Sequence, residues 1–430
     1  MISPARWRWL ALGLTLVAFV AAFAKAWQRP AAASFQPQEI TAQAGSEAFF
    51  STRFVSNNAG PHRHAPSLVV LGDGRLRAFW FSGSREGASD VEIRSAVFDP
   101  RTSKWGPENS VLNRQLAQQG LWRYVKKLGN PVAERSADGT LHLYVVTVSF
   151  GGWAGSSITT LHSSDDGATW SAPQRLITSP FLNVSTLVKG TPFHYADGTI
   201  GLPVYHEFIG KFAELLRLDA DGKVLDKQRL SHGRLALQPV VLVRDAERAE
   251  VLMRHGDGGL NRVIGSRTAD AGRHWAPAAH TALANPNAAV SGVALPDGSL
   301  LAVINDVDGN RDALSLVASS DGGTSWRTLK VLEDQVAGRE PLTAAPRYAE
   351  EVKVQALATD ARLADTQSFA DSSVDHMCIA QRCSFEFSYP YLVLTAQGDL
   401  QLVYTWNRSF IKHVEFSRGW IAQRLKETRK

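Results

Sequence analysis

Basic, amide and carboxylate side chains recur at the beginnings and ends of apolar segments in this sequence. They include Asn130, Lys189, Glu207, Arg254, Asn287, Arg311 and Arg408. Guanidinium groups can bind a planar carboxylate through two parallel hydrogen bonds. If the segment ends meet at one point, these residues form an electropositive pocket that suits an acidic sugar. Each residue alone is more typical of a solvated surface, so the chemistry depends on the elements that gather them.

Those elements are hairpins. An apolar strand, an Asp-Gly or similar turn and a second alternating strand recur at 67–81, 131–148, 191–205, 239–254, 290–304 and 391–404. Asp-Gly supplies the positive φ of tight turns, and alternation buries one face of each strand. With outer strands added, each unit reaches about 50 to 65 residues, the size of a four-stranded propeller blade. We therefore predict an all-β fold, a six-bladed β-propeller with an N-terminal signal or anchor segment.

A second repeat, Ser-x-Asp-x-Gly-x-x-Trp, follows several hairpins, once with Thr in the first place. Its three copies contain the pairs Asp165 and Trp170, Asp270 and Trp275, and Asp321 and Trp326. The Asp can accept backbone N–H bonds within the turn, the Gly takes a strained dihedral, and the Trp can bury its ring between neighbouring sheets. We interpret these residues as structural.

Together the hairpins and this motif resemble the Asp-box (BNR) repeats of the sialidase (neuraminidase)-like superfamily, over residues 61–416. The resemblance implies a sugar-binding centre at the propeller axis. In that family three arginines hold the substrate carboxylate, an Asp is the acid/base, a Tyr is the nucleophile and a Glu activates the Tyr. A neutral Tyr approaches an anomeric carbon that bears a carboxylate with less repulsion than a carboxylate nucleophile would.

The first repeat departs from the family pattern. His-Ala-Pro-Ser-Leu stands where the family has Arg-Ile-Pro-x-Leu, so His64 replaces the first arginine. Arg63 is adjacent, but strand alternation directs it to the opposite side unless the strand is bulged. The stretch Ser-Arg-Glu-Gly-Ala-Ser-Asp resembles the segment with an Arg followed by the acid/base. It makes Arg85 a substrate-binding candidate and Asp90 the acid/base candidate, with a solvated loop carboxylate as the alternative.

The fourth repeat aligns Arg254 with a carboxylate-binding arginine and Gln238 with the activating Glu. An amide can orient a phenol but cannot accept its proton, so a tyrosine nucleophile would need another base. Glu386 or Glu207 could supply it.

In the fifth and sixth repeats, Arg311 matches the third arginine and Tyr389 the nucleophile. The alternative for Tyr389 is a core aromatic residue. Among the other strand-end residues, Asn130, Lys189 and Glu207 are candidates for substrate binding.

Three functions follow. The first is a glycoside hydrolase acting on an acidic glycan, either sialic-acid-like or a uronic acid, with Tyr389 and Asp90 in catalysis. The second is a non-catalytic carbohydrate-binding propeller, because His64 and Gln238 stand where Arg and Glu are expected. The third is a polysaccharide lyase that pairs His206 or His64 with a tyrosine.

The N-terminus has the pattern of an export signal. Two arginines precede an apolar run from Leu10 to Ala24, which is short for about 30 Å of hydrocarbon and favours a cleaved signal over an anchor. We expect residues 1–27 to be a signal peptide or signal anchor, 28–45 a linker, and 46–425 the propeller. The predicted location is periplasmic or extracellular.

An excess of sequence at about 336–384 separates the fifth and sixth hairpins and is predicted as an insertion with a helix-permissive first part. It contains both cysteines, Cys378 and Cys383. In an oxidising compartment these two would close a small loop, and unpaired thiols are the alternative.

The net charge of +5 is spread along the chain and does not predict nucleic-acid binding. The sequence contains neither a recognisable metal-ligand spacing nor a Gly-rich phosphate loop, so no metal and no cofactor are expected. The expected partner is an acidic glycan or oligosaccharide, with membrane contact only through the N-terminal segment.

Overall fold

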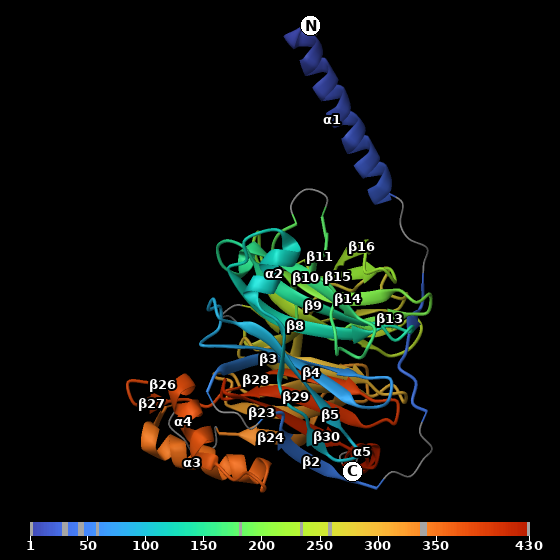
Figure 1. Cartoon of the computed structure of the whole chain (residues 1–430). Coiled ribbons are helices and arrows are strands. Elements are labelled where there is room, and N and C mark those ends of the chain that lie inside the picture. Colours follow the sequence, from blue (N-terminus) through green and yellow to red (C-terminus); the bar gives the residue numbers. More distant parts are fainter. Residues whose placement is uncertain are drawn as a thin grey trace.

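The computed structural model describes residues 3–27, 33–41, 47–56, 60–179, 183–232, 235–256, 260–335 and 342–427. Within these residues the strands form six antiparallel sheets of at least four strands and one three-stranded sheet (Figure 1). The architecture is therefore mostly β, as the sequence predicts.

The six larger sheets follow one another along the chain. The first contains β3 (His62–Val70), β4 (Leu76–Gly83), β5 (Glu92–Asp99), β6 (Lys104–Trp105) and β7 (Asn109–Leu112), and the second β8 (Lys127–Arg135), β9 (Leu141–Val148), β10 (Ser156–Ser163) and β11 (Gln174–Arg175). The third contains β12 (Leu187–Val188), β13 (Phe193–Tyr195), β14 (Ile200–His206), β15 (Phe212–Leu218) and β16 (Val224–Arg229). The fourth contains β17 (Ala236–Val243), β18 (Ala249–His255), β19 (Arg262–Thr268) and β20 (Ala279–Ala284). The last two are β21 (Ser291–Ala294), β22 (Leu300–Ile304), β23 (Ala313–Ser319) and β24 (Arg327–Asp334), and β28 (Phe387–Leu394), β29 (Leu400–Trp406) and β30 (Phe410–Phe416).

The first strands of neighbouring sheets contact one another in a cycle. β3 lies against β8 and β8 against β12; β14 lies against β17, β17 against β21, β21 against β28, and β28 against β3. β2 (Phe50–Phe54) pairs with β30, so an N-terminal strand completes the last sheet. Pairing of this kind leaves no open edge on β30.

The turns have the backbone conformations and the Asp hydrogen bonds that the repeats predict. The Asp-Gly hairpin turns place Gly74 and Gly139 at φ of 86° and 92°, a region that Gly adopts without steric cost. In the three Ser/Thr-x-Asp-x-Gly-x-x-Trp turns, the Asp accepts a backbone N–H from the residue four positions later, at 2.9 Å in each case. The Trp rings are half-buried, and Trp170 packs on Phe79 of the preceding sheet with ring centroids 5.8 Å apart.

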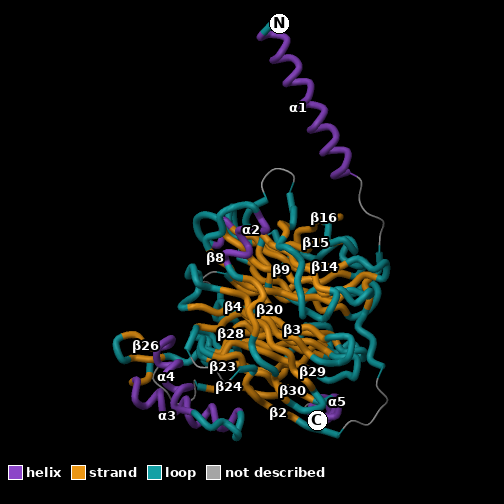
Figure 2. Tube along the Cα trace, in the orientation of Figure 1, coloured by secondary structure: helices purple, strands orange, loops and turns teal. Residues whose placement is uncertain are grey.

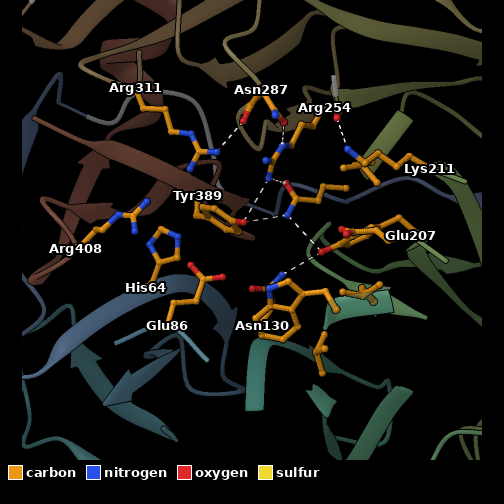
Figure 3. Close-up of a pocket in the computed structure, with 17 residues that line it drawn as sticks. His64, Glu86, Asn130, Glu207, Lys211, Arg254, Asn287, Arg311, Tyr389 and Arg408 are labelled. Atoms are coloured by element: carbon orange, nitrogen blue, oxygen red, sulfur yellow. Dashed lines mark hydrogen bonds between the residues drawn. The ribbon is translucent and has the colours of Figure 1, made fainter. Parts of the chain in front are cut away.

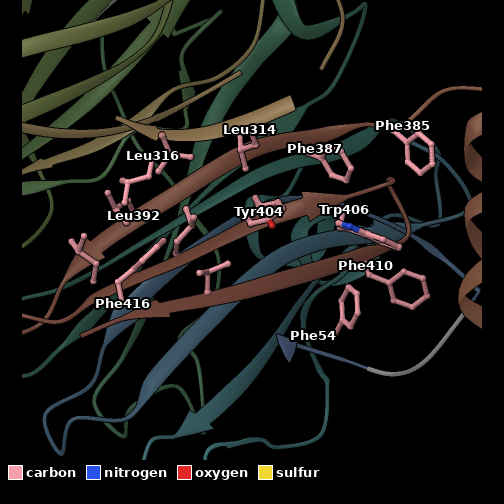
Figure 4. Close-up of a cluster of buried hydrophobic side chains, with 14 of the residues drawn as sticks. Phe54, Leu314, Leu316, Phe385, Phe387, Leu392, Tyr404, Trp406, Phe410 and Phe416 are labelled. Carbon is pink, nitrogen blue, oxygen red and sulfur yellow. The ribbon is translucent and has the colours of Figure 1, made fainter. Parts of the chain in front are cut away.

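One cluster of buried side chains joins the fifth and sixth sheets, with aliphatic residues from the fifth and most of the aromatic rings from the sixth (Figure 4). Phe54 of β2 contacts Trp406, Phe410 and Phe369, the last from the inserted segment. Burying each such ring contributes about 1.5–3 kcal/mol. This packing fixes the strands from which the pocket residues extend.

The insertion contains α3 (Ala345–Thr359), α4 (Thr366–Met377) and a small sheet of β25 (Thr343–Ala344), β26 (Cys378–Ile379) and β27 (Arg382–Cys383). Figure 2 shows it as the helical part at one side of the strand-rich body. Cys378 and Cys383 are joined by a disulfide. Residues 336–341, the first part of the predicted insertion, lie outside the described part of the chain. Smaller helices are α2 (Arg114–Leu121), η1 (Trp153–Gly155) and α5 (Arg418–Glu427).

The N-terminal helix α1 (Pro4–Trp27) projects away from the sheets. Its stretch Arg6–Ala24 is long and apolar enough to cross a membrane, and none of that window is buried. In the predicted linker, residues 33–41 pack on the body: β1 (Phe35–Gln36) pairs with β13, and the Phe35 ring is 1% exposed. The predicted linker residues 28–32 and 42–45 lie outside the described part.

Candidate active site

A cavity of about 260 Å³ is lined by residues in or next to all six larger sheets (Figure 3). Its lining comes from the beginnings of first strands and the ends of second strands, which meet on the same face. The lining residues are His64, Glu86, Asn130, Val146, Trp153, Leu187, Tyr205, Glu207, Lys211, Leu237, Gln238, Arg254, Gly256, Asn287, Arg311, Tyr389 and Arg408. Of the residues expected at the site, the cavity brings together His64, Asn130, Glu207, Gln238, Arg254, Arg311 and Tyr389.

Bulges in four first strands position several of these side chains. The register shifts in β3, β8, β17 and β28, at Ala65, Asn130, Gln238 and Tyr389, each of which is followed by proline. A bulge changes the direction of a side chain and interrupts the hydrogen bonds between two strands. Proline, which has no backbone N–H, is therefore tolerated there. Ala65, Gln238 and Tyr389 have φ of 52°, 49° and 54°, which costs about 1–3 kcal/mol each and is typical of functional sites.

The Tyr389 hydroxyl lies in a network of donors. Gln238 Nε2 donates to its oxygen at 3.3 Å and Arg254 Nη1 at 3.4 Å, and Arg254 Nη1 also donates to Gln238 Oε1 at 3.1 Å. Arg254 therefore places both a donor and a positive charge at this oxygen. The amide of Gln238 orients the phenol but cannot remove its proton.

Three guanidinium groups face the cavity. Asn287 holds two of them: Arg254 Nε donates to its Oδ1 and Arg311 Nη2 to its carbonyl oxygen, both at 2.7 Å. Arg408 comes from the turn after β29 and donates from Nε to Glu386 Oε2 at 2.7 Å. This arrangement can bind a carboxylate from more than one side.

Glu386 lies behind the arginines and does not line the cavity. It pairs with Arg408 and with Arg311 at 3.4 Å, and accepts a hydrogen bond from Ser388 at 2.6 Å. Burial alone would raise the pKa of this carboxyl, but Arg408, Arg311 and Ser388 together hold it below its ordinary value. Glu386 is therefore a fixed counter-charge for the arginines, and its side-chain hydrogen bonds go to Arg311, Arg408 and Ser388 instead of the Tyr389 hydroxyl.

His64 occupies the place of the family's first arginine. Burial, with His62 and Arg408 nearby, holds the pKa of His64 well below its ordinary value, so the imidazole is neutral at pH 7. Its ring contacts that of Tyr389, with centroids 4.4 Å apart. Arg63 pairs with Glu108 at 3.0 Å and does not line the cavity, so Arg408 supplies the third guanidinium.

The loop after β4 presents a different carboxylate from the expected one. Asp90 is exposed and accepts hydrogen bonds from the backbone N–H and hydroxyl of Ser84, so it folds back on its own loop. Arg85 is also exposed and outside the cavity. Glu86 lines the cavity instead (Figure 3).

Glu207 and Asn130 form the wall opposite the arginines. Burial raises the pKa of Glu207, although Arg254 and two lysines act against it, so its proton is held to higher pH. Asn130 Nδ2 donates to the Val188 carbonyl at 3.0 Å and to the Tyr205 hydroxyl at 3.5 Å. Asn130 therefore positions this wall and leaves its amide oxygen for a ligand.

Lys189 lies beneath the cavity and not on its surface. Its side chain is buried, and Nζ donates to the carbonyl oxygens of Pro66 at 3.3 Å and Pro390 at 3.2 Å. Burial lowers the pKa of this ammonium to about 7. It is not exposed for direct substrate contact.

One of the two histidines suggested for a lyase, His206, lies away from the cavity. His206 stacks on Phe212 outside the cavity, with ring centroids 4.6 Å apart. Within the described ranges, no group of three or more His, Cys, Asp and Glu side chains is arranged to hold a metal ion.

Sequence reasoning missed Glu86, Lys211 and Tyr205 as pocket residues. The signal for Tyr205 is its position next to the end of β14, which corresponds to that of Arg254 in β18. Lys211 directly precedes β15, in the loop that follows β14. Glu86 lies three residues after β4 ends. Loop curvature decides whether Glu86 or Asp90 turns inward, and residue spacing does not encode it.

Residues 74–402 match the family model described as a BNR repeat-like domain. The chain belongs to the sialidase-like BNR-repeat superfamily. A search of curated protein sequences gives no significant match to this BNR-repeat chain.

Solved structures resemble its fold. Hadza microbial sialidase Hz136 has a TM-score of 0.57 at 16% identity, with 82% of this chain and 65% of that chain covered. The NanB sialidase from Streptococcus pneumoniae has a TM-score of 0.56 at 9% identity, with 84% and 69% covered. The intramolecular trans-sialidase from Ruminococcus gnavus has a TM-score of 0.55 at 12% identity, with 84% and 95% covered. The BNR-repeat chain thus spans 65% of the length of Hz136, and at these identities the likeness concerns the fold alone.

Proposed function

We propose that the protein is a sialidase-like glycoside hydrolase that acts on an acidic glycan, with a sialic-acid-like or uronic acid substrate. The observation that carries the proposal is the cluster around Tyr389. Its phenol oxygen accepts hydrogen bonds from Arg254 and Gln238, and Asn287 holds Arg254 and Arg311 beside it. The substrate carboxylate lies against Arg254, Arg311 and Arg408, which places the adjacent anomeric carbon near the phenol.

The reaction follows a retaining course. The Tyr389 oxygen attacks the anomeric carbon and forms a glycosyl–tyrosine bond while the bond to the leaving oxygen breaks. A carboxyl group donates its proton to that leaving oxygen. A water molecule then gives a proton to the same carboxylate, attacks the anomeric carbon and releases the sugar from Tyr389. The group that received the Tyr389 proton returns it to the departing phenolate oxygen, which restores the starting enzyme.

We assign the acid/base role to Glu86, which lines the cavity, and not to the exposed Asp90. Activation of Tyr389 is electrostatic in this proposal. Arg254 and Gln238 stabilise the developing phenolate. Glu207, whose pKa is raised by burial, receives the phenol proton directly or through water.

Binding without cleavage is the second candidate. It is favoured by Gln238, which contacts the Tyr389 hydroxyl where a proton-accepting Glu would stand. The arginines would then hold an acidic sugar that is not turned over.

One experiment separates the two. Wild type, Tyr389→Phe, Glu86→Gln and Asp90→Asn are compared on fluorogenic sialosides and uronosides, with the exposed-residue variants Tyr124→Phe and Glu350→Gln as matched controls. We expect turnover by the wild type, Asp90→Asn and both controls, and losses of at least about 100-fold in Tyr389→Phe and Glu86→Gln. Turnover by Tyr389→Phe equal to that of the wild type contradicts the mechanism. Binding of these acidic sugars without hydrolysis by the wild type supports the second candidate.

We also propose that the six sheets are the blades of one closed propeller, and that α1 exports the protein as a signal peptide or anchor to a periplasmic or extracellular location. The cyclic contacts of the first strands support the first part. The apolar stretch Arg6–Ala24 supports the second. N-terminal sequencing of the secreted or membrane-bound protein tests whether the helix is removed.

A further inference from the structure

The third sheet contributes an unusual segment to the axis. Where four other first strands have a residue followed by proline, this one has Lys189 followed by Gly190. Because Gly190 has no side chain, it packs closely on the bulge of β17: a Cβ there would lie 1.9 Å from the Pro239 carbonyl oxygen. Asn130, at the bulge of β8, donates to the carbonyl oxygen of Val188, the residue that precedes Lys189.

The Lys189 side chain reaches the other two bulges. Nζ donates to the carbonyl oxygens of Pro66 and Pro390, which directly follow Ala65 and Tyr389, both at positive φ. Residues 188–190 therefore contact all four bulges that carry or flank pocket side chains. Strained backbone of this kind persists only where surrounding contacts hold it.

Lys189 is also a buried cation beside aromatic rings. Nζ lies 4.7 Å from the ring centroid of Tyr391 and 5.8 Å from that of Tyr389. No ion pair of Lys189 occurs among residues that the structure describes, and its titratable neighbours are Tyr389 and Tyr391 on β28 and His64 on β3. An uncompensated buried charge is costly, and it increases the positive potential felt at the pocket floor.

We propose that Lys189 is a positioning residue: it holds the bulges of β3 and β28 so that the Tyr389 phenol points at the substrate, and its charge adds to the positive potential at the pocket floor. The catalytic part of this inference rests on the proposed function. The structural part does not, because the two carbonyl contacts exist whether or not the protein is an enzyme.

The structural part is tested by hydrogen exchange and mass spectrometry. Lys189→Met removes the charge and the donors, Lys189→Arg retains both, and the exposed Lys223→Met is the matched control. In Lys189→Met we expect exchange at 62–70 and 386–394 to rise by about tenfold or more. Exchange at 236–243 should stay unchanged, because that bulge is contacted by Gly190.

The catalytic part is tested on the same proteins. We expect kcat of Lys189→Met to fall by about 100-fold with KM within about threefold, and Lys189→Arg to recover most of kcat. Wild-type kcat should also fall as pH rises through the range in which Lys189 loses its proton, and Lys189→Arg should not show that fall.

The outcomes are distinguishable. Unchanged exchange at both bulges in Lys189→Met, or an equal rise in all three segments, overturns the positioning role. Faster exchange at the two bulges in a protein without hydrolase activity retains the positioning role and rejects the proposed function. Wild-type turnover by Lys189→Met, with substrate cleaved, overturns the catalytic part of the inference while the proposed function stands.

Discussion

Lys189 makes a quantitative prediction about stability. Burial lowers its pKa from 10.5 to about 7. Between these values the unfolded chain binds a proton that the folded protein does not, so stability rises with pH across this window. The slope approaches about 1.4 kcal/mol per pH unit, and integration from pH 7 to pH 9 gives an increase of roughly 2 kcal/mol.

The assay is denaturant unfolding of the wild type and Lys189→Met at pH 7 and pH 9. Other groups titrate equally in both proteins, so the difference between their pH dependences isolates Lys189. We expect the wild type to gain roughly 2 kcal/mol more than the variant. The exposed Lys223→Met should behave as the wild type does. The same pH dependence in wild type and Lys189→Met would refute the idea that a desolvated ammonium lies beneath the pocket.

Three further predictions concern the supporting structure. Glu386→Gln leaves Arg311 and Arg408 without their buried counter-charge and should cost about 3–5 kcal/mol in urea unfolding, whereas an unchanged midpoint would argue against the pairing. Phe35→Ala removes a ring that is 1% exposed and should lower the free energy of unfolding by about 3–5 kcal/mol in the same assay. An unchanged free energy of unfolding would mean that this segment is a linker that does not pack on the sheets. Asn287→Ala should weaken binding of an acidic sugar by about tenfold in calorimetry, because the Arg254 guanidinium loses its side-chain acceptor while the backbone carbonyl that holds Arg311 remains; unchanged affinity would contradict that role.

The hairpins were predictable because their signals are local. An Asp-Gly pair fixes a turn whatever surrounds it, and the three Asp turns repeat one hydrogen-bond pattern. Placing Arg254, Arg311 and Tyr389 at one site was also within reach, because each matches a site position of the family that the repeats resemble, and the cavity contains all three.

The remaining site residues depend on tertiary geometry. Asp90 and Glu86 are four residues apart in one loop, and only the folded loop turns Glu86 toward the cavity. Lys189 stands at a strand end as the pocket residues do, yet its side chain runs to the carbonyls of other strands. The sequence does not show where the Glu86 and Lys189 side chains point, because their directions depend on contacts between distant strands.

The central claim is that Tyr389, held among arginines, bonds covalently to an acidic sugar. It is tested most directly by incubating the wild type with a 3-fluorinated glycosyl fluoride of the cleaved sugar, which slows release of the intermediate, followed by peptide mass spectrometry. We predict one sugar attached to the peptide that contains Tyr389, and none in Tyr389→Phe. Complete cleavage with the sugar attached to another residue, or to none, would contradict the account.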